Sequence, residues 1–197
     1  MARIAPRPAE ELTELADQFA MTEAMMGFVP NSLPTMARVP GLAEAFSQLG
    51  AAVFGNQRVP LELNQMVAQV ASSAAGCRYC QAHTAHNVHR LGVSDEKIAD
   101  LWNFQTSEHF DDAERAALNL ALHAGAVPNT ATDEQFEELR KYYDDDQIAG
   151  LVATIAMFGY LNRWNDTMAT DLEDEPAAFG ERVLAASGWE PGAHRSS

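Results

Sequence analysis

Two cysteines and a histidine lie close together in residues 76–83, which read GCRYCQAH. Cys77 and Cys80 are three positions apart, so on a helix their sulfurs lie one turn from each other and can form a disulfide. If the helix begins at Cys77, its free N–H groups and its dipole lower the pKa of that thiol, and Arg78 adds positive charge. His83 follows Cys80 by three positions and can accept its proton or stabilise its thiolate. The spacing predicts reversible thiol–disulfide chemistry without a metal or an organic cofactor.

Two other interpretations of the cysteine pair are open. Cysteines in an alanine-rich helix can be small buried hydrophobic residues. A structural zinc site is the second interpretation, because His86 and His89 continue the pattern. Structural zinc sites normally bring two ligand pairs together across a loop. The candidates here lie on one helix at steps of three, so their side chains point in progressively different directions around the helix axis. We therefore favour redox chemistry, and we expect His86 and His89 to be solvated or to lie at an interface.

Composition excludes several classes of partner. The 197 residues carry 13 Lys and Arg against 28 Asp and Glu, a net charge of −15, which repels phosphate backbones and anionic headgroups. We therefore expect neither nucleic acid nor a membrane as a partner. Residues 1–10 lack the apolar core of a secretory signal, and no apolar run is long enough to span a bilayer. The only two cysteines would close almost no loop, which indicates a reducing, cytoplasmic location.

The elements that must position the motif are two helices. Apolar residues recur at steps of three and four after Pro60, which suits a helix start, and Gly76 suits the helix end. A second helix is predicted from Cys77 to about Leu91, with Gly92 directly after it. The motif thus lies at the junction of two consecutive helices.

The remaining sequence predicts further helices and no strand, so the fold class is all-α. Three of the expected helices are Ala9–Met26, Gly41–Phe54 and Ala177–Ala186. A short helix capped by Ser94 is expected to turn Ile98, Leu101 and Trp102 inward, and a longer one to run from Asp111 or Asp112 to Ala126. Thr132 and Gln135 form a capping box for the next helix, and Ile148–Leu161 follows the acidic run Asp144–Asp146. Met21, Met25, Met26 and Met157 are expected in the core, and the chain is expected to fray after Gly188. We predict one compact multi-helix bundle over residues 1–197, with its core at about 41–170 and with a peripheral N-terminal helix and C-terminal tail.

A weak internal match raises the question of duplication. Residues 64–76 align without gaps to residues 146–158 with four identities, among them Gln65 and Gln147. Alanine-rich helices can match by chance, so duplication and coincidence both stay open. If the match is a duplication, two related helical halves pack as hairpins.

The segment from Pro60 to Ile98 resembles the core of the carboxymuconolactone decarboxylase superfamily, and within it the alkylhydroperoxidase D-like, peroxidase-related branch. The resemblance rests on the Cys-x-x-Cys pair together with the helix before it, the histidine after it and the Leu-Gly-x-Ser that follows. Residues 144–168, with Asn162, Arg163 and Asn165, also resemble that branch. The resemblance implies an all-helical fold that assembles into homo-oligomers and reduces small hydroperoxides with electrons from an external dithiol.

The family resemblance also implies roles for individual residues. Cys80 corresponds to the peroxidatic cysteine, and Cys77 to the one that resolves the sulfenic acid into a disulfide. A glutamate and a histidine form the proton relay of the family, but the glutamate position holds Gln65 here and the usual histidine position holds Thr84. His83, one residue earlier, is the candidate for the histidine role, and Glu62 is one helical turn before Gln65.

The function that these features predict is a thiol-dependent peroxidase or disulfide oxidoreductase with Cys80, Cys77 and His83 as its catalytic residues. The helix dipole favours Cys77 as the attacking thiol, whereas the resemblance and the adjacent His83 favour Cys80, and we expect Cys80. Two alternatives remain: a lyase or isomerase acting on a small carboxylated substrate with His83 as base, and a non-catalytic redox-sensing oligomer.

Overall fold

The computed structural model describes residues 2–55 and 58–195, and in these ranges every regular element is a helix. The α-helices are α1 (Ala16–Met26), α2 (Ser32–Met36), α3 (Leu42–Phe54), α4 (Leu61–Ala75), α5 (Arg78–Arg90), α6 (Asp95–Ala99), α7 (Asp112–Gly125), α8 (Asp133–Leu139), α9 (Asp145–Met168) and α10 (Asp174–Val183). Short 3-10 turns precede α1 at Ala9–Glu11 and Thr13–Leu15, follow α6 at Asp100–Asn103, and lie in the C-terminal segment at Ala185–Ser187 and Gly192–His194. The predicted all-α fold class is confirmed.

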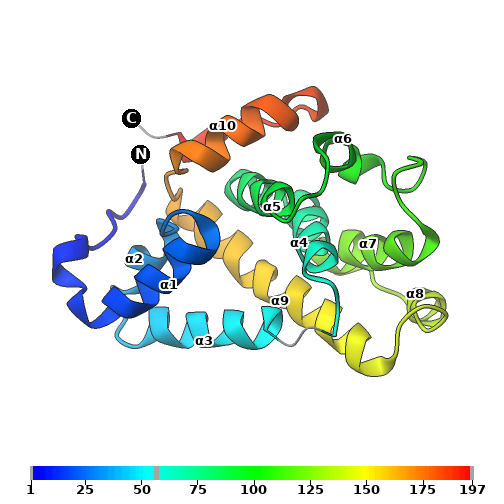
Figure 1. The fold of residues 1–197 in the computed structure, drawn as a ribbon, viewed down its shortest axis with the longest axis horizontal. Coiled ribbons are helices and arrows are strands. Elements are labelled where there is room, and N and C mark those ends of the chain that lie inside the picture. The colour runs from blue at the N-terminus through cyan, green and yellow to red at the C-terminus, as the bar shows by residue number, and fades with distance from the viewer. Residues whose placement is uncertain (1, 56–57, 196–197) are drawn as a thin grey trace.

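Helix α4 lies at the centre of the main core and packs against α5, α7 and α9 (Figure 1). Gly125 in α7 is so close to α4 that a Cβ atom there would meet Ala71 Cα at 2.7 Å, so only glycine permits this helix spacing. Between α4 and α9, Thr154 Oγ1 donates to Asn64 Oδ1 at 3.1 Å in a buried position.

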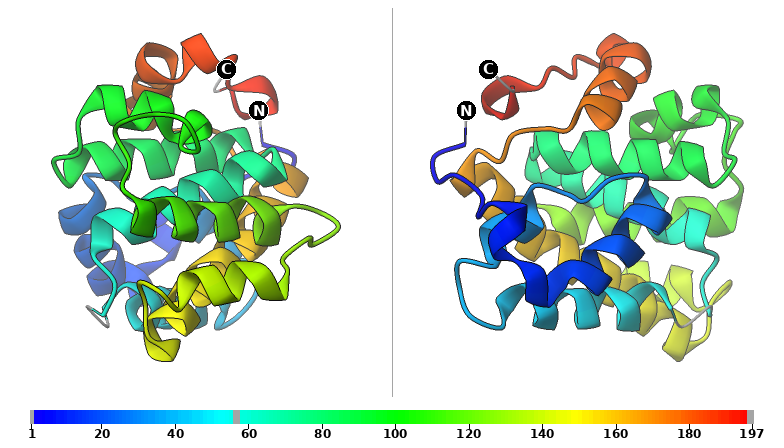
Figure 2. Two further views of the ribbon diagram at one scale, coloured as in Figure 1. Left: turned by 90° about the vertical axis from the view of Figure 1, so that its right-hand side faces the viewer. Right: turned by 60° about the vertical axis from the view of Figure 1, so that its left-hand side comes forward.

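The N-terminal helices form a second, smaller core against the last half of α9. Its buried members are Leu12, Leu15, Leu33, Met36, Ala37 and Ala43, with Tyr160, Leu161 and Trp164 packed against them. The C-terminal part of the chain covers α5. Helix α10 packs against α5, and the segment after α10 continues along the same edge of the bundle, as Figure 2 shows. The cysteine motif at the start of α5 is therefore enclosed by segments from both ends of the chain.

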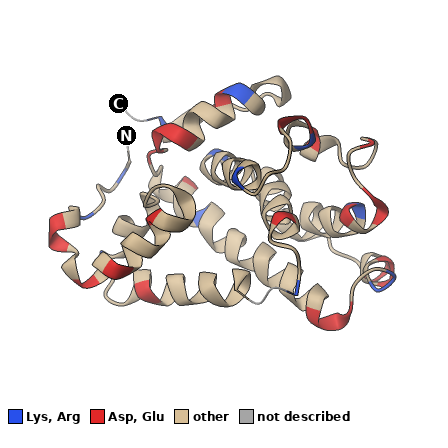
Figure 3. Ribbon diagram, viewed as in Figure 1, with Lys and Arg blue, Asp and Glu red and all other residues tan. Residues whose placement is uncertain are grey.

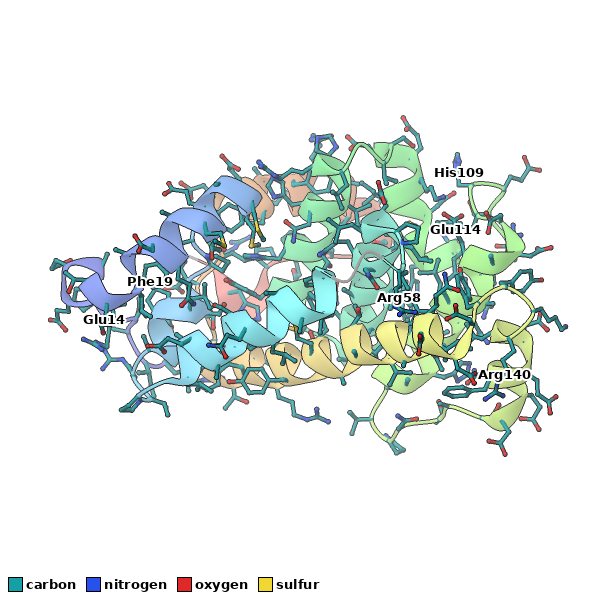
Figure 4. All side chains as sticks on the ribbon, turned by 60° about the horizontal axis from the view of Figure 1, so that its bottom comes forward. Glu14, Phe19, Arg58, His109, Glu114 and Arg140 are labelled. Atoms are coloured by element: carbon teal, nitrogen blue, oxygen red, sulfur yellow. The ribbon has the colours of Figure 1, made fainter. Side chains whose placement is uncertain are left out.

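The acidic surplus lies at the periphery of the bundle and at helix starts (Figure 3). Asp144 is the N-cap of α9 and forms a capping box with Gln147. Arg58 and Arg140, both labelled in Figure 4, pair with the first-turn carboxylates Asp146 and Asp145 at 2.6 and 3.3 Å. This confirms the interpretation of the acidic run as a solvated helix start. Among the described residues, no helix combines the length and the apolarity needed to cross a bilayer.

Several local expectations are wrong. The segment 9–26 is not one helix, because 3-10 turns occupy its first third and α1 begins only at Ala16. Met21 and Met25 are 67% and 69% exposed and Trp102 is 50% exposed, since α1 and the turn after α6 lie at the edge of the bundle. The chain does not fray after Gly188, because Trp189 and His194 are buried. The segments of the internal match lie in the adjacent helices α4 and α9, and the duplication itself stays a prediction.

Candidate active site

The cysteine pair lies where α4 turns into α5. Gly76 ends α4 in the left-handed region, with φ of 81°, and Cys77 is the N-cap of α5. The Cys77 sulfur accepts a hydrogen bond from the Cys80 backbone N–H at 3.5 Å, so it replaces the usual oxygen of an N-cap residue. Both cysteines are free thiols and buried. The structure therefore holds the two residues one helical turn apart, as the spacing predicts.

The two sulfurs have different surroundings. A hydrogen bond to Cys80, burial, and the negative charges of Cys80 and Asp166 all raise the pKa of Cys77 far above its ordinary value. The N–H of Cys80 acts in the opposite direction but is outweighed. The expectation that the helix start lowers the pKa of Cys77 is therefore wrong, because the side chain is buried beside negative charge. Cys77 keeps its proton.

The Cys80 sulfur receives a hydrogen bond from the other side. Asn165 Nδ2, on α9, donates to Cys80 Sγ at 3.5 Å, in a buried contact. Donors directed at a sulfur stabilise negative charge on it. The amide oxygen of Asn165 is buried and has no hydrogen-bond partner among the described residues. An acceptor is thus available next to the sulfur that the family resemblance assigns as the attacking one.

His83 is held by a carboxylate from the far end of the chain. His83 Nε2 and Glu173 Oε2 are 2.5 Å apart, and Glu173 Oε1 accepts from the Tyr79 hydroxyl at 2.9 Å and from the Asn31 backbone N–H at 2.5 Å. Burial opposes the charge of Glu173, but the positive charge of His83 and the hydrogen bonds outweigh it, so the pKa of Glu173 lies below its ordinary value. The Tyr79 ring stacks on the His83 ring at 4.2 Å. These contacts fix the imidazole orientation.

The positions that differ from the family pattern have structural contacts of their own. Gln65 is buried in α4, and its Oε1 accepts from Asn87 Nδ2 at 3.4 Å. Thr84 donates to the carbonyl of Cys80 at 2.7 Å, one turn back in its own helix. The carboxylate beside His83 is supplied by Glu173 instead of a residue of α4.

The remaining histidines of α5 lie outside this arrangement. His86 is buried between Phe28 and Phe179, with ring centroids 6.0 and 5.8 Å away. The expectation of a solvated His86 is wrong, and burial lowers its pKa. The His89 side chain is 46% exposed and pairs with Asp95 at 2.8 Å. Neither histidine converges with the cysteines, which argues against the zinc site considered from the sequence.

A different histidine approaches the motif from the C-terminal segment. Ligand atoms of Cys77, Asp166 and His194 all lie within 4.8 Å of one another, the only such group of three among the described residues. Neither Asp166 nor His194 was identified from the sequence, and Glu173 and Asn31 were also missed. All four lie far from the motif in sequence. Asn165 was noted only as part of the resemblance, which was the one available signal for its region.

Comparison with known proteins identifies the family. Residues 40–123 match the model of the carboxymuconolactone decarboxylase family. The debrominase Bmp8, solved as a variant with one cysteine replaced by alanine in complex with 2,3,4-tribromopyrrole, superposes with a TM-score of 0.87 at 35% identity, covering 92% of this chain and 97% of that chain. The chain belongs to the carboxymuconolactone decarboxylase family. The resemblance drawn from residues 60–98 is confirmed.

Other similar proteins share less sequence with this chain. An alkylhydroperoxidase AhpD core structure, an uncharacterized peroxidase-related protein from Ralstonia eutropha JMP134, superposes with a TM-score of 0.80 at 22% identity, over 89% of this chain and 94% of that one. It supports the fold alone. The uncharacterized protein YdfG of Bacillus subtilis (strain 168) is 27% identical over 95 residues, which cover 48% of this chain and 63% of that relative.

Proposed function

We propose that this protein is a thiol-dependent oxidoreductase of the peroxidase type, in which Cys80 attacks the substrate and Cys77 resolves the product. The observation that carries the proposal is the asymmetry of the pair. Asn165 donates to the Cys80 sulfur from α9, whereas the Cys77 sulfur, among the described residues, accepts only the Cys80 backbone N–H of its own helix turn and lies buried beside Asp166. A donor directed at the Cys80 sulfur suits that sulfur to the attacking role.

The peroxidase reaction has two steps on these residues. The Cys80 thiolate attacks one oxygen of a hydroperoxide, the O–O bond breaks, and Cys80 becomes a sulfenic acid while the other oxygen leaves as water or an alcohol. Cys77 then attacks the Cys80 sulfur, and the disulfide forms as water leaves. An external dithiol reduces the disulfide and restores both thiols by exchange.

Two polar groups have roles in the first step. The free Oδ1 of Asn165 can accept a hydrogen bond from the hydroxyl of a hydroperoxide. His83 supplies the proton that the leaving oxygen needs, and Glu173 stabilises the imidazolium before the transfer. The buried surroundings suit a small substrate over a bulky one.

Peroxide consumption with a dithiol donor tests this function. We expect the wild-type protein to consume a small hydroperoxide and to lose two mass units when oxidised without donor, and we expect Cys80→Ser to lose all turnover. Cys77→Ser should still form a sulfenic acid that dimedone traps, because its attacking thiol is intact. If neither single variant nor the wild type forms a sulfenic acid, the peroxidase proposal is wrong.

A second candidate, reductive dehalogenation, follows from the likeness to Bmp8. Here the Cys80 thiolate would attack a bromine of a brominated aromatic ring, the ring carbon would take a proton, and Cys77 would displace bromide to give the same disulfide. Two thiols thus supply the two electrons. Bromide release from a polybrominated pyrrole, measured in the same assay beside Cys80→Ser, decides between this reaction and peroxide reduction.

A variant with both cysteines replaced by serine, together with the dithiol assay, separates the two remaining alternatives. A lyase or isomerase that uses His83 as base keeps its activity when both cysteines are serine. A redox-sensing oligomer forms the Cys77–Cys80 disulfide reversibly but shows no catalytic turnover with any dithiol donor.

A further inference from the structure

The C-terminal segment is fixed against the first turn of α5. Trp189 Nε1 donates to the carbonyl of Arg78 at 3.1 Å. Its ring lies on Gly180 of α10, where a Cβ atom would meet Trp189 Cη2 at 2.7 Å. After this anchor the chain turns at Gly192–His194, and the His194 side chain is only 3% exposed. A buried histidine is thereby placed beside Cys77.

We propose that His194 is the base that takes the proton of Cys77 during disulfide formation, and that Asp166 is the positioning residue that stabilises the imidazolium. The inference rests on the proposed function and assigns the proton path of its second step. Cys77 needs such a base, because a buried thiol that keeps its proton is a poor nucleophile.

The hydrogen bonds of His194 define which of its nitrogens can act as a base. His194 Nδ1 is 2.8 Å from the carbonyl of Thr170, and a carbonyl can only accept, so Nδ1 carries a proton. Nε2 is therefore unprotonated in the neutral ring. Once Nε2 takes a proton, it can donate to Asp166 Oδ1 at 3.1 Å. Cys77, His194 and Asp166 lie within 4.8 Å of one another, so the transfer needs only a small movement of the thiol.

The step balances on these groups. The Cys77 S–H bond breaks as its sulfur bonds to the Cys80 sulfur, and the proton goes to His194 Nε2. The oxygen of the Cys80 sulfenic acid leaves and becomes water with one further proton. The imidazolium then loses its proton to solvent beside Asp166, whose side chain is 44% exposed and opens this pair to water.

A metal ion at the same three residues is the competing interpretation, since an imidazole whose other nitrogen donates to a carbonyl is typical of metal ligands. Structural zinc sites need four ligands, whereas this group among the described residues has three.

The test isolates disulfide formation from peroxide chemistry. Dithiodipyridine, a small neutral disulfide suited to a protein of net charge −15, should react first with Cys80 and release one thiopyridone. Attack by Cys77 on the mixed disulfide then releases the second. We expect His194→Asn, which keeps an N–H for Thr170 but removes Nε2, to leave the first phase unchanged and to slow the second about 100-fold.

Two matched variants complete the experiment. Asp166→Asn, at a half-exposed position that tolerates the change, should slow the second phase about 5-fold to 10-fold. His109→Asn, whose side chain is 47% exposed in the turn before α7 (Figure 4), should change neither phase. An unchanged second phase in both His194→Asn and Asp166→Asn overturns the relay, as does equal slowing of both phases, which indicates altered access.

Peroxide turnover distinguishes this inference from the proposed function. If the wild type does not consume peroxide but His194→Asn slows the second phase, the relay stands and the peroxidase proposal fails. If the wild type consumes peroxide and His194→Asn and Asp166→Asn leave the second phase unaffected, the relay fails and the peroxidase proposal stands.

Discussion

Two histidine–carboxylate pairs flank the cysteine motif, and they differ in how the carboxylate is held. In the His83–Glu173 pair both side chains are largely shielded, at 7% and 12% exposure, and Glu173 accepts two further hydrogen bonds, from Asn31 and Tyr79. In the His194–Asp166 pair the histidine is buried at 3% exposure, but Asp166 is 44% exposed. One pair is closed to water, and the other has one open side.

The difference indicates different physical tasks. A closed carboxylate with three partners is costly to disturb, so Glu173 joins Asn31, α5 and the start of α10 as well as orienting His83. An open carboxylate contributes little to stability, because water screens its charge, but it can exchange a proton with solvent. We therefore expect changes at Glu173 to act mainly on folding, and changes at Asp166 to act mainly on the rate of thiol chemistry.

The largest expected effect is that of Glu173→Ala. It leaves His83, Tyr79 and the Asn31 N–H without their acceptor, and we expect the free energy of unfolding to fall by about 3–4 kcal/mol. Urea unfolding at neutral pH measures it. Asp166→Asn is the matched change in the open pair and should cost about 0.5 kcal/mol. Equal costs for the two variants would remove the distinction between the pairs.

Acid titration gives a smaller effect with a defined sign. The pKa of Glu173 is lower in the folded protein than its ordinary value, so its ionised form stabilises the fold above that ordinary value, and this stability is lost as the pH falls through the folded pKa. The stability difference between wild type and Glu173→Gln should therefore shrink as the pH is lowered from neutral to below the ordinary glutamate value. A difference that stays constant over this range would contradict the lowered pKa.

Trp189→Phe is expected to act on the open pair only. It keeps an aromatic ring on Gly180 but removes the donor to the Arg78 carbonyl, at a cost of about 1 kcal/mol. We expect the NMR resonances of the His194 imidazole to shift while those of His83 stay unchanged. Shifts at both rings would show that the two pairs are coupled through α5.

The sequence contained most of the information on the central helices, because their ends are marked by local chemistry. Gly76, with its positive φ, ends α4 at the predicted place. The predicted capping box of Thr132 with Gln135 is present, as is the predicted Ser94 cap. The prediction for the N-terminal segment was wrong because its leucines and methionines share a helical spacing. Only tertiary packing decides that Leu12 and Leu15 are buried and Met21 is not.

The candidate site was predictable only as far as it is local. Cys77, Cys80 and His83 lie within two turns of one helix, so spacing alone brings them together. Glu173 is 90 residues after His83, and Asn165 is 85 residues after Cys80, and no periodicity in the sequence links such positions. The pKa of Cys77 was assigned the wrong direction because its interaction with Cys80 and its burial, together with the charge of Asp166 in α9, outweigh the helix start, and the spacing of the motif shows neither burial nor Asp166.

The 90-residue separation between His83 and Glu173 has a consequence for biosynthesis. Chains fold from the N-terminus as they leave the ribosome, so both cysteines are outside long before Asn165, Glu173 and His194 have been translated. Until then the two sulfurs lack the donors and the base that distinguish them. The nascent polypeptide thus carries the two thiols without their long-range contacts until the C-terminal third of the chain has folded against α5.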